Sequence, residues 1–99
     1  MSNDSSPAHQ LQQIVEVAFA EAPTLYANGF VNGLGLTDAY IVLQTNGRSA
    51  AVVNLSLAAA KTLGQSLLEM VESFERETGT RVATINQLQD QAANGSQLR

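Results

Sequence analysis

One long amphipathic segment, residues 54–79, most constrains what this chain can fold into. Ser56 is a favourable N-cap, and Gly79 can take the left-handed conformation that ends a helix. The apolar side chains between them recur every three or four positions, as they do along one face of an α-helix: Leu57, Ala60, Leu63, Leu67, Met70, Val71 and Phe74. This pattern predicts an unbroken helix from Ser56 to Thr78 that packs across one face of a sheet, with the rest of the chain packed against it.

The residues before this helix predict an antiparallel meander of three or four strands. Asn46-Gly47 is a strong signal for a two-residue type I′ turn, so residues 40–45 should pair with residues 48–53 as a hairpin. Residues 24–35 alternate between larger and smaller side chains, as another strand would. Gly29 and Gly33 lie on its small face, where we expect the helix to approach.

Residues 10–22 fit two patterns equally well. Helical spacing is present at Leu11, Ile14, Val15, Ala18 and Phe19, and Ser6-Pro7 could begin such a helix as cap and first-turn proline. A half-buried strand is the alternative, since Val15, Val17 and Phe19 alternate with other residues. Residues 80–86 could form a short edge strand or a docked tail.

Length and composition limit the classes of function. We expect one α+β domain over residues 10–86, with a disordered lead at 1–9 and a flexible tail at 87–99. Ninety-nine residues without cysteine bury little surface and cannot use disulfides, so we expect the chain to associate with itself as a homodimer or higher even oligomer. One histidine and no cysteine argue against a metal site, and we expect no cofactor.

Charge and hydropathy exclude other partners. The formal net charge is −4 and the five Lys and Arg residues are scattered, which argues against nucleic acid. No apolar run reaches the length of about 20 residues that spans a membrane. The start of the sequence lacks the pattern of a signal peptide, so we expect a cytoplasmic protein.

The order of several weak motifs resembles a known family. Tyr26-Ala27-Asn28 opens a strand, Thr37-Asp38 marks a turn, and Ser56 begins a helix with Lys61 that closes with Phe74-Glu75 and Gly79. This order is similar to the small bacterial family catalogued as domain of unknown function 3467, over residues 14–79. The resemblance implies a strand meander followed by one long helix, and it favours the strand reading of residues 10–22. It implies no activity.

Few side chains suggest a site. Tyr26, Asn28 and Arg48 are candidates for a small-molecule or anion site at a subunit interface, and Asp38 is best explained as a turn residue. The candidates for an interface are Phe30, Leu63, Leu67, Met70 and Phe74. We therefore expect a non-enzymatic interaction or assembly module that binds itself or another protein. The alternative hypothesis is a regulator that binds a small molecule or an anion.

Overall fold

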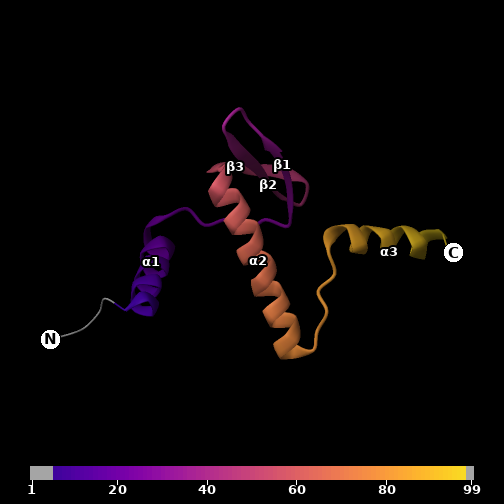
Figure 1. Ribbon diagram of the computed structural model, residues 1–99. Coiled ribbons are helices and arrows are strands. Elements are labelled where there is room, and N and C mark those ends of the chain that lie inside the picture. The colour runs from indigo at the N-terminus through magenta and orange to yellow at the C-terminus, as the bar shows by residue number, and fades with distance from the viewer. Residues whose placement is uncertain (1–5, 98–99) are drawn as a thin grey trace.

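The computed structural model describes residues 6–97, and the remaining parts of the predicted lead and tail, residues 1–5 and 98–99, lie outside the described residues. The elements follow one another as α1 (Pro7–Glu21), β1 (Gly29–Leu34), β2 (Asp38–Thr45), β3 (Arg48–Ser56), α2 (Leu57–Thr78) and α3 (Ile85–Gln97) (Figure 1). The chain is thus an α+β protein in which a long helix follows a strand meander, as the sequence predicted.

The three strands form one antiparallel sheet in the order β1-β2-β3. Asn46 and Gly47 both have positive φ, of 51° and 82°, which is the requirement of the type I′ turn that the sequence predicted between β2 and β3. A register shift lies between Leu43 and Gln44, so Leu43 pairs with Ala51 while Gln44 pairs with Ser49. The predicted hairpin is therefore confirmed, and both of its arms are longer than expected.

Helix α2 has the predicted start and end. The Ser56 hydroxyl accepts a hydrogen bond of 3.1 Å from the Ala59 N–H, which satisfies one amide of the first turn. Gly79 has φ 70°, and its N–H donates to the Glu75 carbonyl at 2.9 Å. Because Ser56 is also the last residue of β3, strand and helix join without a spacer.

Helix α1 corrects the interpretation of residues 10–22 as a strand. The Ser6 hydroxyl accepts from the His9 N–H at 3.2 Å, and Pro7 occupies the first turn, where its missing N–H costs nothing. Residues 7–9 of the predicted lead belong to this helix, and β1 begins only at Gly29. The family resemblance favoured a strand for residues 10–22, whereas Ser6-Pro7 indicated the start of a helix. The Ser6-Pro7 signal was correct.

Helix α3 stands where the sequence suggested a flexible tail from residue 87, and residues 80–84 form no strand. The helix starts with a capping box. Gln87 N–H donates to the Thr84 hydroxyl at 3.2 Å, and the Thr84 N–H donates to the Gln87 side-chain oxygen at 2.8 Å. This reciprocal pair satisfies two backbone donors and fixes the first turn.

Within residues 6–97, only one helix, α2, packs on the sheet to a substantial extent. Helix α2 contacts β2 and β3 and then extends past the sheet, whereas α1 stands apart from both, and α3 points away from them after its first residue, Ile85 (Figure 1). The radius of gyration is 17.9 Å, against roughly 13 Å for a compact domain of this length. Among residues 6–93 no side chain is buried. The expectation that the rest of the chain packs against α2 is therefore wrong for α1 and α3.

Candidate protein-interaction surface

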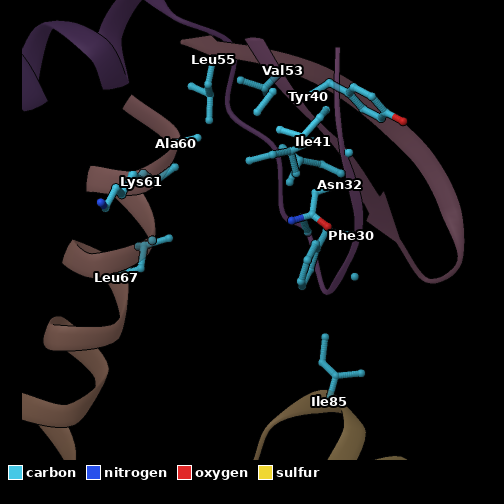
Figure 2. Close-up of a pocket in the computed structure, with 18 of the residues that line it drawn as sticks. Phe30, Asn32, Tyr40, Ile41, Val53, Leu55, Ala60, Lys61, Leu67 and Ile85 are labelled. Atoms are coloured by element: carbon cyan, nitrogen blue, oxygen red, sulfur yellow. The ribbon is translucent and has the colours of Figure 1, made fainter. Parts of the chain in front are cut away.

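An apolar groove of about 1030 Å³ lies between the sheet and α2. We call it the central groove. Figure 2 shows side chains of all three strands on one side of it, the first turns of α2 on the other, and Ile85 at its far end. The larger aliphatic and phenylalanine side chains that line it are Phe30, Leu34, Ile41, Leu43, Val53, Leu55, Leu63, Leu67 and Ile85, and Ala27, Ala39 and Ala60 lie between them in the lining.

The strand register explains why apolar residues gather there. Asn32, Ile41 and Val53 are paired in a row across β1, β2 and β3. Residues two positions away on each strand point to the same face, because side chains alternate along a strand. The neighbouring rows are Phe30–Leu43–Ala51 and Leu34–Ala39–Leu55. The sheet therefore presents a nearly continuous apolar face, with Asn32 as the polar exception.

The five interface candidates are divided between two places. Phe30, Leu63 and Leu67 line the central groove together. Met70 and Phe74 continue the same stripe along α2 but lie outside the lining of the central groove. Their exposed fractions run from 39% at Leu63 to 60% at Met70. The sequence pattern thus identified the apolar face of α2, but the chain itself does not cover that face.

The surface area of the whole chain shows how much remains open. It is 8601 Å², whereas a compact monomer of 10.5 kDa would expose roughly 5,400 Å². About 3,000 Å² more surface is exposed than a self-contained fold of this mass would leave. Large apolar residues of α1, β1 and α2 contribute to this exposed surface.

The electrostatics of the central groove are simple. Lys61 is the one charged side chain among its lining residues within the described part of the chain. The acidic residues of α2, such as Glu69 and Glu72, lie beyond the groove lining. An occupant of this groove would therefore meet an apolar surface with a single positive charge near the start of α2.

The ligand-site candidates Tyr26, Asn28 and Arg48 lie at the turn end of the sheet, each linked to Thr45 or Asn46, and Asn28 also lines the central groove. The Asn28 amide nitrogen donates to Asn46 Oδ1 at 2.9 Å, and its oxygen accepts from the Asn46 N–H at 2.8 Å. The Thr45 hydroxyl donates to the Tyr26 carbonyl. Arg48 pairs with Thr45 across the hairpin. These contacts hold residues 26–28, which lead into β1, against the hairpin turn. We call the two hydrogen bonds between Asn28 and Asn46 the clasp.

Two further residues have structural roles that the sequence suggested only in part. A Cβ on Gly33 would collide with the Tyr40 phenol ring. The close neighbour of Gly33 is therefore an aromatic side chain, and the prediction that the helix approaches this glycine is wrong. Figure 2 shows Tyr40 pointing away from α2. The Asp38 carbonyl accepts from the Gly35 N–H at 2.7 Å, so this residue serves the turn before β2.

Several residues of the central groove were not predicted from the sequence. Ile41 and Val53 were predicted as strand residues, but not as one face with Phe30, and Leu55 lies beyond the predicted hairpin arm at 48–53. The signal that finds them is the hairpin register counted outward from Asn46-Gly47, which fixes the rows of the sheet. Ala60 was predicted only as a member of the apolar stripe of the helix, and it lines the groove beside Gly64.

Comparison of the chain with family models, curated proteins and solved structures finds no match in any of the three. The resemblance to domain of unknown function 3467 therefore stays a prediction. Within the described residues, no three His, Cys, Asp or Glu side chains are grouped so that they could hold a metal ion. None of the helices in the described range combines the length and apolar character that crossing a bilayer requires.

Proposed function

We propose that this protein is a non-enzymatic interaction module that works as a homo-oligomer, either a dimer or a higher even assembly. The observation that carries the proposal is the open apolar surface: none of residues 6–93 is buried, and the central groove is lined almost wholly by apolar side chains. A chain in this state gains little from the hydrophobic effect, which supplies most of the stability of folded proteins.

The amount of open surface fits a permanent association. The excess is about 3,000 Å² per chain, whereas a standard complex buries roughly 800 Å² per partner and an obligate homodimer about 1,000–2,500 Å² per partner. Obligate interfaces also resemble a domain core cut in half, which is the character of the central groove. A second chain would supply the core that one chain lacks.

The experiment that tests this proposal is sedimentation equilibrium of the full chain at several micromolar concentrations. We expect the mass of a dimer or a larger even oligomer, and we expect cooperative unfolding whose midpoint rises with chain concentration, as linkage requires. A folded monomer across the whole concentration range would overturn the proposal.

The alternative, a regulator that binds a small molecule or an anion near Tyr26, Asn28 and Arg48, has less support. Both polar atoms of the Asn28 side chain are already used in the clasp to Asn46. A thermal-shift screen against nucleotides and metabolites separates the two functions, because a ligand that binds only the folded protein raises its melting temperature. We expect no reproducible shift.

A further inference from the structure

We propose that α1 of one copy lies in the central groove of a second copy, and that the exchange is reciprocal. This inference rests on the proposed homo-oligomer and names the segment that forms its interface. The occupant is thus an amphipathic helix of the same sequence, bound in the helix-in-groove mode that many proteins use for recognition.

Helix α1 carries an apolar face that its own chain leaves uncovered. Figure 1 shows the helix standing apart from the sheet and from α2. Phe19 is 73% exposed and Ile14 is 65% exposed. A helix of 15 residues is marginal in water without tertiary contacts, so α1 needs a partner surface to be stable.

The spacing of α1 suits a groove. Its apolar residues follow the i, i+3, i+4, i+7, i+8 pattern of a docking helix: Leu11, Ile14, Val15, Ala18 and Phe19. On the α2 side the groove is lined by the small residues Ala60 and Gly64 as well as by the longer side chains of Lys61, Leu63 and Leu67. A Cβ built on Gly64 would meet nothing within 4 Å. These small residues allow the backbones of two helices to approach closely, while the larger side chains of the sheet form the opposite wall.

The charges of the two surfaces are complementary. Helix α1 contains Glu16 and Glu21 and has neither lysine nor arginine. Glu21 lies three positions after Ala18 and seven after Ile14, which places it beside the apolar stripe. Lys61 is the charged residue of the central groove in the described chain. A helix with an acidic flank therefore matches this groove better than a basic helix would.

The segment between α1 and β1 favours a second copy over the chain's own groove. The Tyr26 carbonyl accepts from the Thr45 hydroxyl, and the Asn28 N–H donates to the Gln44 carbonyl at 3.0 Å, so the chain is already held in line with the sheet there. Ala22 is extended, with ψ 152°, as a residue before proline should be. Only Pro23, Thr24 and Leu25 are left to reverse the chain, and the proline ring restricts that reversal.

The test uses cysteine cross-linking, which the chain suits because it contains no cysteine. Full-length Ala18→Cys is mixed with isotope-labelled full-length Ala60→Cys, allowed to exchange subunits, and oxidised mildly. Ala20→Cys and Ala58→Cys are matched controls, since each moves the thiol two positions along its helix and so to the other face. Circular dichroism confirms that each variant keeps its helix content.

We expect the Ala18→Cys and Ala60→Cys mixture to form a covalent mixed-label dimer several-fold faster than either mixture that contains a control. The inference is wrong if this excess is missing while wild type still sediments as an oligomer, because another surface then forms the interface. It is also wrong if the double variant Ala18→Cys/Ala60→Cys gives an internally linked monomer, since α1 then folds onto its own chain. A monomeric wild type would instead remove the proposed function itself.

Discussion

The clasp between Asn28 and Asn46 yields the sharpest prediction about stability. Replacing Asn28 with alanine removes two hydrogen bonds, of 2.9 Å to Asn46 Oδ1 and 2.8 Å from the Asn46 N–H. Each such bond contributes about 0.5–1.5 kcal/mol net, and both residues are exposed, so the lower half of that range applies. We expect Asn28→Ala to lower the free energy of unfolding by about 1–2 kcal/mol.

A double-mutant cycle isolates one of these bonds. Asn46→Gly removes the side-chain acceptor but keeps the backbone N–H and suits the positive φ of 51° at that position. Combined with Asn28→Ala, it should show a coupling of about 0.5–1 kcal/mol, which belongs to the bond between the two side chains. Urea unfolding at one fixed chain concentration gives all four free energies, and the concentration must be fixed because association shifts the midpoint.

Asn54→Ala is the matched control for the same measurement. Asn54 is an exposed residue of β3, and its side chain makes no hydrogen bond in the described part of the structure. We expect its replacement to change the free energy of unfolding by less than about 0.5 kcal/mol. A result in which Asn28→Ala costs no more than Asn54→Ala, or in which the cycle shows no coupling, would refute the clasp as a source of stability.

Three other predictions concern turns and caps. Gly47→Ala should lower the free energy of unfolding by about 1–2 kcal/mol because φ is 82° there, and Gly47→Asn should cost less; equal costs would count against the backbone explanation. Ser56→Ala should cost about 1 kcal/mol in urea unfolding by removing the cap of α2, while Ser66→Ala, inside the same helix, should be near neutral. Thr84→Ala should speed amide hydrogen exchange in α3 more than Gln87→Ala does, because an alanine side chain at the cap cannot accept from the first turn; equal or unchanged rates would contradict the capping box.

Local signals in the sequence predicted local structure well. Asn46-Gly47, Ser56 and Gly79 each require a particular backbone geometry or hydrogen bond, and each has it in the structure. The start of α3 could have been found in the same way, since Thr84 and Gln87 stand at the spacing of a capping box. Such signals act over three or four residues, so the rest of the fold hardly affects them.

Signals that depend on distant contacts were less informative. The pattern of residues 10–22 allowed both a helix and a strand, because apolar spacing says which side chains share a face and not which neighbour covers them. The apolar stripe of α2 likewise shows which side chains share a face, but not what packs against them. Leu63 and Leu67 were identified as residues that need cover, but whether that cover comes from the same chain is decided by the length and direction of the connecting segments.

The shared residue Ser56 has a mechanical consequence. Strand β3 ends where α2 begins, so no loop is present between them to absorb a change in the direction of the strand, and such a change is passed directly to the helix. At 1.5 Å per residue, the 22 residues of α2 span about 33 Å, so a tilt of about 10° at Ser56 would carry the far end of the helix through about 6 Å. A small change in the twist of the sheet would therefore become a large displacement at Phe74 and Gly79.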